Sequence, residues 1–218
     1  MNLISGSKKI LCFGDSNTWG YIPNTDTKSI YQRYSAEIRY PGVLQKLLGE
    51  KYEVIEDGVN SRTISVEDRR PGKSSRTAIS YLPQLFYAND PLDYLIIMIG
   101  SNDLKTQFAL SPAEVAEQII TLLQTAKSLA SQIDQAKPKL LYIVPPPIND
   151  AIPYAKNRFE NGLQRYQEMI KILKALLIIN EIDFIDCFSL VDLGSDGLHL
   201  TEAGHKKLGE AIFRKLFS

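Results

Sequence analysis

The sequence predicts a three-layer α/β fold, in which helices cover both faces of a parallel sheet. Five short runs rich in aliphatic and β-branched residues recur along the chain, and segments with helical spacing of apolar residues lie between them. Strands and helices that alternate in this way pair through right-handed crossovers, which place helices on both faces. The length of 218 residues suits a single core, so we expect residues 1–218 to form one domain.

The predicted strands have the continuous apolar character of parallel strands that are buried on both faces. In chain order they span residues 9–13, 52–56, 94–99, 140–144 and 184–188. Turn-forming residues such as Gly, Pro, Asn, Asp and Ser follow the runs, so the strand ends can be located from the sequence.

The clearest helix signal combines an N-cap serine, Ser111, with a proline at the first helical position, Pro112, and a glutamate at the third, Glu114. Apolar residues then recur with helical spacing at Val115, Ile119, Leu122, Leu123, Ala126, Leu129 and Ile133. Other patterns predict helices at 40–48, in part of 78–87, at roughly 156–180 and after Thr201. Residues 21–39 and 61–77 fit no regular element, and we expect long loops there.

Composition and charge argue against several classes of protein. Lys plus Arg and Asp plus Glu both number 25, so the net charge of zero predicts no nucleic-acid or membrane partner. The first ten residues lack the apolar core of a signal peptide, and no apolar run is long enough to span a membrane, so we expect a cytoplasmic location. Cys12 and Cys187 lie in apolar runs without C-x-x-C spacing, which predicts buried free thiols.

Residues with catalytic potential follow four of the predicted strands. Ser16 comes after the first strand, Gly58 after the second, Asn102 after the third, and Asp196 and His199 after the fifth. In an open parallel sheet the carboxyl ends of the strands form one edge, where ligands bind. We therefore expect these five residues to meet in one site.

Acyl transfer explains why these residue types would be grouped. A serine hydroxyl becomes a strong nucleophile when a histidine accepts its proton, and a carboxylate fixes the tautomer of that histidine. Ser16, His199 and Asp196 fit these three roles. The tetrahedral intermediate needs donors for its oxyanion, and the candidates are the backbone amides of Ser16 and Gly58 and the side-chain amide of Asn102.

The same residues resemble the sequence blocks of a known family. Gly14-Asp15-Ser16, Gly58, Gly100-x-Asn102-Asp103 and Asp196-x-x-His199 match the SGNH (GDSL) hydrolases in order and across nearly the whole chain. The resemblance implies a flavodoxin-like fold with a five-stranded parallel sheet of order 2-1-3-4-5. It also implies a serine hydrolase that cleaves esters through an acyl-enzyme, with small-molecule esters as substrates.

Further stretches resemble the bacterial arylesterase/acyltransferase branch of that family, namely FGDSNTWG at 13–20, NSRT at 60–63, IMIGSND at 97–103 and VPPP at 144–147. Asn17 departs from the family pattern, which has leucine at that position. No motif is assigned to residues 61–77. Both differences bear on substrate preference more than on the chemistry.

Simpler explanations exist for several of these residues. Gly14-Asp15-Ser16 taken alone is typical of a strand-to-helix turn, and Asn102 and Asp103 are common in turns. Trp19 is either a core aromatic residue or a substrate-binding wall of the acyl pocket, since aromatic side chains serve both purposes.

The remaining titratable residues offer weaker candidates. His205 stands beside two lysines inside the last helix and is expected to be a solvated surface residue. Asp192 competes with Asp196 as the acid but has no motif support, and Asp103 is expected to be structural. A metal site would need ligands at a spacing that the two histidines and their neighbours do not offer, so we expect neither a metal nor a cofactor.

Alternatives remain open within and outside the enzyme class. The family also contains carbohydrate deacetylases, thioesterases and lysophospholipases. A non-catalytic flavodoxin-like ligand-binding module is a further alternative, although the chain lacks the phosphate-binding motifs G-x-x-x-x-G-K-[ST] and G-x-G-x-x-G. The acyl group, the leaving group and the choice between water and alcohol as acceptor are not encoded in any motif.

Assembly is the last expectation. Both long loops, 21–39 and 61–77, follow strands that carry candidate catalytic residues. In the similar arylesterase branch such insertions form oligomer contacts that narrow the entrance to the site. Tyr21, Tyr31, Arg33 and Tyr34 are of types favoured at interfaces, so we expect a homo-oligomer.

Overall fold

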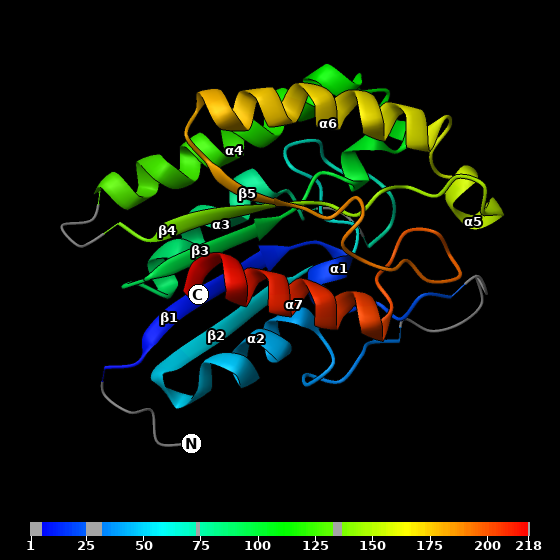
Figure 1. Cartoon of the computed structure of the whole chain (residues 1–218). Coiled ribbons are helices and arrows are strands. Elements are labelled where there is room, and N and C mark those ends of the chain that lie inside the picture. Colours follow the sequence, from blue (N-terminus) through cyan, green and yellow to red (C-terminus); the bar gives the residue numbers. More distant parts are fainter. Residues whose placement is uncertain (1–5, 25–31, 73–74, 133–136, 218) are drawn as a thin grey trace.

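The computed structural model describes residues 6–24, 32–72, 75–132 and 137–217. Its five-stranded parallel sheet has the order β2-β1-β3-β4-β5, which confirms the predicted fold class (Figure 1). The strands are β1 (Lys8–Gly14), β2 (Tyr52–Gly58), β3 (Tyr94–Met98), β4 (Lys139–Val144) and β5 (Asp183–Asp186). Both ends of all five strands lie within two residues of the predicted ranges. β5 ends early because the carboxylate of Asp186 accepts the Phe188 amide in a turn at 2.9 Å.

The helices are α1 (Ser16–Trp19), α2 (Tyr40–Leu48), α3 (Ala78–Ala88), α4 (Pro112–Gln132), α5 (Pro153–Lys156), α6 (Gly162–Ile179) and α7 (Glu202–Phe217). Short 3₁₀ turns occur at Gly49–Lys51, Asn102–Leu104 and Thr106–Phe108. The helix predicted at roughly 156–180 begins later, as α6 at Gly162, directly after Asn161, which adopts a left-handed conformation with φ of 50°; Lys156 is the last residue of the separate short helix α5.

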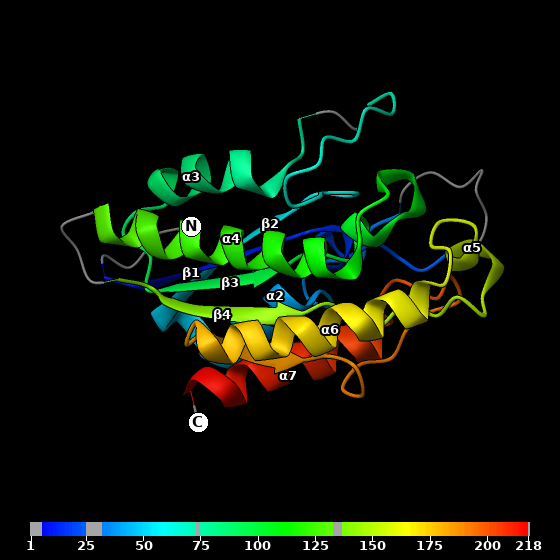
Figure 2. The same cartoon turned by 90° about the horizontal axis from the view of Figure 1, so that it is seen from above.

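Alternate residues of β1 serve the two faces of the sheet. Leu11 and Phe13 pack into a core with α3, α4 and α6, whereas Ile10 and Cys12 pack into a core with α2 and α7. Figure 2 shows α3 and α4 on one side of the sheet and α2 and α7 on the other. Each face of the sheet is therefore covered, as the continuous apolar strands predict.

The start of α4 forms as the sequence predicts. The Ser111 hydroxyl accepts the Glu114 amide at 3.2 Å, and the Glu114 carboxylate accepts the Ser111 amide at 2.7 Å. This reciprocal pair satisfies backbone donors that the first turn of a helix leaves open. The carboxylate gains these partners, so the hydroxyl and amide of Ser111 lower the pKa of Glu114.

The described parts of the two long loops are attached to the body of the domain. Tyr21 and Arg33 form an antiparallel bridge, and the amide of Tyr34 donates to Gly20 at 2.8 Å. In the second loop the amide of Ala78 donates to Thr63 at 2.8 Å. Residues 25–31 and 73–74, and with them Tyr31, lie outside the described residues.

Two expectations about the interior can be compared with the structure. Cys12 and Cys187 are buried free thiols, as predicted, and burial raises the pKa of both. None of the helices within the described ranges is long and apolar enough to cross a membrane.

Candidate active site

Ser16 lies at the carboxyl end of β1, at the first position of the short helix α1. The Asp15 carboxylate caps this helix by accepting the Asn17 amide at 2.9 Å, and Gly20 closes it in a left-handed conformation. Gly14 is required just before the turn, because a Cβ there would lie 2.1 Å from the Thr18 hydroxyl and 2.5 Å from the Met98 carbonyl oxygen. The turn therefore presents Ser16 at the edge where the other strands end.

The structure brings Ser16, His199 and Asp196 together in one chain of hydrogen bonds. Nε2 of His199 lies 2.9 Å from Oγ of Ser16, and Nδ1 lies 2.6 Å from Oδ2 of Asp196. The other carboxylate oxygen of Asp196 accepts the amides of Leu198 and His199 at 2.9 and 3.0 Å. This arrangement orients the ring so that one nitrogen faces the serine hydroxyl.

Opposing effects act on the Asp196 carboxylate, whose side chain is fully buried. Burial tends to raise its pKa, but the hydrogen bonds and charge of His199, together with the Leu198 amide, outweigh burial. The net result is a pKa below the usual value. The carboxylate is therefore ionised at neutral pH, the state in which it can stabilise an imidazolium.

The side chain of Asn17 links the helix that begins at Ser16 to the loop that contains His199. Its side-chain amide donates to the Leu198 carbonyl at 3.3 Å, and its side-chain oxygen accepts the Leu200 amide at 3.0 Å. Both partners flank His199. The asparagine that departs from the family pattern thus ties the helix of Ser16 to the loop of His199.

Tyr21 covers His199, a contact that no sequence motif indicated. The two ring centroids lie 4.4 Å apart with an interplanar angle of 31°. Tyr21 belongs to the bridge with Arg33, so the first long loop is positioned against the imidazole. The sequence signal for this contact is limited to the presence of an aromatic residue, Tyr21, two positions after Trp19.

Asn102 follows β3 and faces the same site. Its side-chain nitrogen donates to the Arg62 carbonyl at 3.0 Å and lies 3.4 Å from a carboxylate oxygen of Asp15. The Ser101 hydroxyl donates to the same Asp15 oxygen at 2.9 Å. Burial raises the pKa of Asp15, and the Asn17 amide and Ser101 hydroxyl oppose that shift.

Gly58 is not among the described residues that line the cavity, and its role as an oxyanion-hole donor stays a prediction. A Cβ at Gly58 would lie 2.1 Å from the Trp19 amide nitrogen, so the glycine serves the close packing of α1 on β2. Asn60 and Ser61, which follow Gly58 in this segment, both line the cavity, and Ser61 has a φ of 63°. Among the described residues, no acceptor engages the Ser61 amide.

Trp19 is likewise not among the described residues that line this cavity, so the alternative of a pocket wall gains no support and stays a prediction. Its side chain is half-buried at the end of α1. The Arg33 guanidinium lies 5.2 Å from its ring centroid, and the Tyr21 ring lies 6.4 Å away. The position of Trp19, three residues after Ser16, indicates that it lies near the site but does not indicate the direction of its side chain.

His205 is fully buried, which contradicts its prediction as a solvated residue. Its Nδ1 accepts the Tyr40 amide at 3.3 Å, and the edge of Tyr34 packs against the ring. His205 shares the inner face of α7 with Leu208 and Ile212, a spacing that outweighs the two adjacent lysines. Burial lowers the pKa of His205 to about 3, so the ring is neutral.

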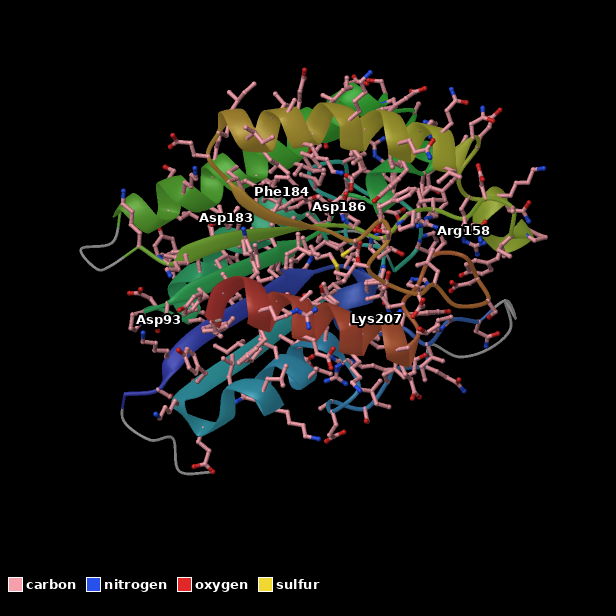
Figure 3. All side chains as sticks on the ribbon, viewed as in Figure 1. Asp93, Arg158, Asp183, Phe184, Asp186 and Lys207 are labelled. Carbon is pink, nitrogen blue, oxygen red and sulfur yellow. The ribbon has the colours of Figure 1, made fainter. Side chains whose placement is uncertain are left out.

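The two competing acids have other partners. Asp192 is half-exposed and pairs with Lys207 at 2.7 Å; Figure 3 shows Lys207 on α7. Asp103 is buried, as a structural residue would be, and one of its oxygens accepts the Ile64 amide at 2.8 Å. Burial raises the pKa of Asp103 to about 7.

A cavity of about 130 Å³ opens beside Ser16 and His199. Ser61, Asn102 and Tyr21 also line it, and so do the cationic residues Arg70, Lys105 and Arg158. The volume lies below the roughly 300–1,000 Å³ of pockets for drug-sized ligands. Within the described ranges, no three His, Cys, Asp or Glu side chains are grouped closely enough to hold a metal ion.

The chain is similar to known proteins in both sequence and structure. The GDSL-like Lipase/Acylhydrolase family matches residues 12–207. A carbohydrate acetylesterase from Sinorhizobium meliloti is similar in structure, with a TM-score of 0.87 and 33% identity over 96% of this chain and 98% of that one. An aryl esterase from M. smegmatis has a TM-score of 0.87 and 34% identity over the same shares.

A curated relative extends the comparison to a longer protein. An acetylxylan esterase from Xylanibacter ruminicola is 26% identical over 94% of this chain. The match covers 42% of that esterase, so this chain spans less than half of its length. Since the family match covers most of the sequence, the chain belongs to the GDSL-like lipase/acylhydrolase family of ester-cleaving hydrolases.

Proposed function

We propose that this chain is a serine esterase that cleaves small carboxylic esters through an acyl-enzyme on Ser16. The observation that carries the proposal is the unbroken chain of hydrogen bonds from Asp196 through His199 to Ser16 at a cavity. A ligand-binding module without catalysis would not need this alignment. The family match supports the same class of reaction.

The proposed reaction assigns one step to each side chain. His199 accepts the Ser16 proton on Nε2 while Oγ attacks the ester carbonyl, and the resulting imidazolium is stabilised by Asp196. The imidazolium then donates its proton to the leaving alkoxide as the tetrahedral intermediate collapses to the acyl-enzyme. A water molecule repeats the sequence, releases the acid and regenerates the serine.

The oxyanion hole is proposed to use the amides of Ser16 and Ser61 and the side chain of Asn102. Ser16 opens α1, so no acceptor within the helix engages its backbone N–H. The positive φ of Ser61 reverses the backbone beside the cavity, and its amide is unengaged among the described residues. Ser61 thus replaces Gly58 as the second-strand donor.

Labelling with a fluorophosphonate tests the nucleophile. Only an activated serine reacts quickly, so the wild-type chain should label and Ser16→Ala should not. Ser101→Ala is a matched control, because Ser101 lines the same cavity but contacts Asp15 instead of His199. Labelling that persists in Ser16→Ala would remove the proposal.

A carbohydrate acetyl ester is the second candidate substrate. Oδ1 of Asn60 is buried without a hydrogen-bond partner among the described residues, and Asn60 lines the cavity. An unpaired buried acceptor of this kind would suit a substrate hydroxyl. Two similar proteins are a carbohydrate acetylesterase and an acetylxylan esterase. Acetylated xylose compared with p-nitrophenyl esters of increasing acyl length would separate the two candidates.

Acyl transfer to alcohols and assembly into a homo-oligomer also stay proposals. Described side chains expected at the interface have partners within the chain, since Arg33 pairs with Glu56 and Tyr34 packs on His205. Light scattering at micromolar concentration measures the assembly, and a monomer of 24.5 kDa would remove that proposal.

A further inference from the structure

Among the described residues, the cavity beside Ser16 is lined by three cationic side chains and by no carboxylate. Arg70, Lys105 and Arg158 reach it from three different segments of the chain. Ester hydrolysis by Ser16 and His199 does not require any of them. Their convergence therefore calls for a separate explanation in terms of the substrate.

Lys105 is the most informative of the three. Only 8% of its surface is exposed, yet no hydrogen bond or ion pair to its ammonium occurs within the described ranges. A buried charge without a partner is costly, so folded proteins rarely retain one without a function. An ammonium in this position, next to a cavity, is available for an anionic group of a ligand.

Arg158 is held close to Lys105 by the backbone. The amide of Thr106, the residue after Lys105, donates to the Arg158 carbonyl at 3.0 Å. The Arg158 guanidinium lies 3.6 Å from the Tyr154 ring centroid and donates to the Tyr154 carbonyl at 2.8 Å. These contacts hold the side chain in place before a ligand binds. Figure 3 shows Arg158 beside α5, at the end of the molecule to which the strands point.

Nearby acids do not cancel this charge. Asp68 is buried and accepts Nε of Arg70 at 2.9 and 3.1 Å, so its charge is already engaged. Asp15 also acts on Lys105, but its carboxylate is held by Asn17 and Ser101. The local balance of Lys105, Arg70 and Arg158 against Asp68 and Asp15 is positive.

We propose that Lys105 and Arg158, assisted by Arg70, form an anion subsite that selects esters carrying a carboxylate close to the scissile bond. The proposal deepens the esterase function and rests on it. Planar guanidinium groups match carboxylates well, and a buried ammonium provides a strong point charge.

Titration of Lys105 gives the subsite a characteristic pH dependence. Burial, followed by the charge of Arg70, lowers the pKa of Lys105 to about 8, against the opposing effects of Asp68 and Asp15; Arg158 lowers it further. The ammonium is mostly charged at pH 7 and loses its proton as the pH rises through about 8. Preference for an anionic ester should therefore fall above that pH.

Matched pairs of esters test the subsite in the full chain. The first pair is para-acetoxybenzoate and neutral para-acetoxybenzamide; the second is ethyl hydrogen succinate and neutral ethyl succinamate. We expect kcat/KM to favour the anionic member of one pair by roughly 10- to 100-fold at pH 7. The first pair places the carboxylate on the alcohol side and the second on the acyl side.

Variants connect the preference to the named residues. Lys105→Met should reduce the ratio of anionic to neutral kcat/KM to about one, and Arg158→Gln should reduce it about threefold to tenfold. Lys156→Gln is the matched control. This exposed lysine is the last residue of α5, two positions before Arg158, and it does not line the cavity. Its ratio should equal that of the wild type.

Binding separates failure of the subsite from failure of the esterase function. In Ser16→Ala protein, calorimetry should detect para-acetoxybenzoate or ethyl hydrogen succinate, and Lys105→Met should abolish that signal. If neither ester is cleaved but binding depends on Lys105, the esterase proposal fails and the subsite stands. Equal rates for charged and neutral esters, with no binding that depends on Lys105 or Arg158, would overturn the subsite.

Discussion

The loop that ends at His199 and the first turns of α7 each contain a histidine, yet their surroundings differ in every relevant respect. His199 has a carboxylate on Nδ1 and a serine hydroxyl on Nε2, and 12% of its side chain is exposed. His205 is fully buried, accepts only a backbone amide on Nδ1, and has no partner for Nε2 among the described residues. Function therefore follows from the two partners of the ring, since burial alone yields a neutral packing residue.

The largest expected effect distinguishes the two histidines by activity. His199→Ala should lower kcat by at least about 10⁴-fold, and Ser16→Ala should do the same, because each removes the same catalytic unit. The double variant should be little worse than either single variant. Steady-state kinetics with p-nitrophenyl acetate measures all three.

His205→Asn is the matched control for this series. Asparagine retains an acceptor for the Tyr40 amide, so kcat at pH 7 should stay within about twofold of the wild type. If the losses at Ser16 and His199 multiply in the double variant, the two residues do not act as one unit.

A second prediction concerns Asp196, the carboxylate that pairs with His199 and has no counterpart beside His205 among the described residues. Asp196→Asn should leave the fold intact but lower kcat by roughly 10⁴-fold, because an amide favours the wrong tautomer of His199. Asp192→Asn provides the comparison, since Asp192 pairs with Lys207 outside the site. Near-normal activity in Asp196→Asn, with a loss in Asp192→Asn, would reassign the acid.

The smallest effect concerns stability in acid. Burial lowers the pKa of His205 to about 3, whereas the unfolded chain has a histidine pKa of about 6.5. Between these values the unfolded state binds more protons, so stability falls as the pH decreases from about 6.5 to about 3. His205→Asn should remove this contribution, which is at most about 1.4 kcal/mol per pH unit.

Urea unfolding at pH 7, 5 and 4 measures that slope. The curve of stability against pH should be flatter for His205→Asn than for Lys206→Gln, which changes an exposed neighbour. Parallel curves for the two variants would show that His205 has an ordinary pKa in the folded state.

Much of the fold could be predicted from the sequence because its signals are local. The continuous apolar runs locate the strands, and Ser111 with Glu114 marks the start of α4. The late start of α6 at Gly162 could not be predicted, because the left-handed conformation of Asn161 has no signal in the sequence pattern. The two adjacent lysines predict a solvated His205, whereas its spacing from Leu208 places it on the buried face of α7.

The candidate site, too, could be predicted only where its signals are local in the sequence. Ser16, Asn102, Asp196 and His199 follow strand ends, so the topology of the sheet brings them together. The direction of a backbone amide depends on the conformation of a loop, so the sequence alone does not distinguish Gly58 from Ser61 as the proposed donor after β2. The grouping of Arg70, Lys105 and Arg158 at the cavity depends on the conformations of segments that are far apart in the sequence, so no local pattern predicts it.

Gly58 also limits how the protein can change over time. Any side chain there would overlap the backbone of α1, whose first residue is Ser16. A substitution at this position would therefore disturb the packing of the sheet and the placement of the nucleophile in one event. A variant that keeps the fold but loses the reactive serine must therefore carry its substitution at another position, such as Ser16 itself.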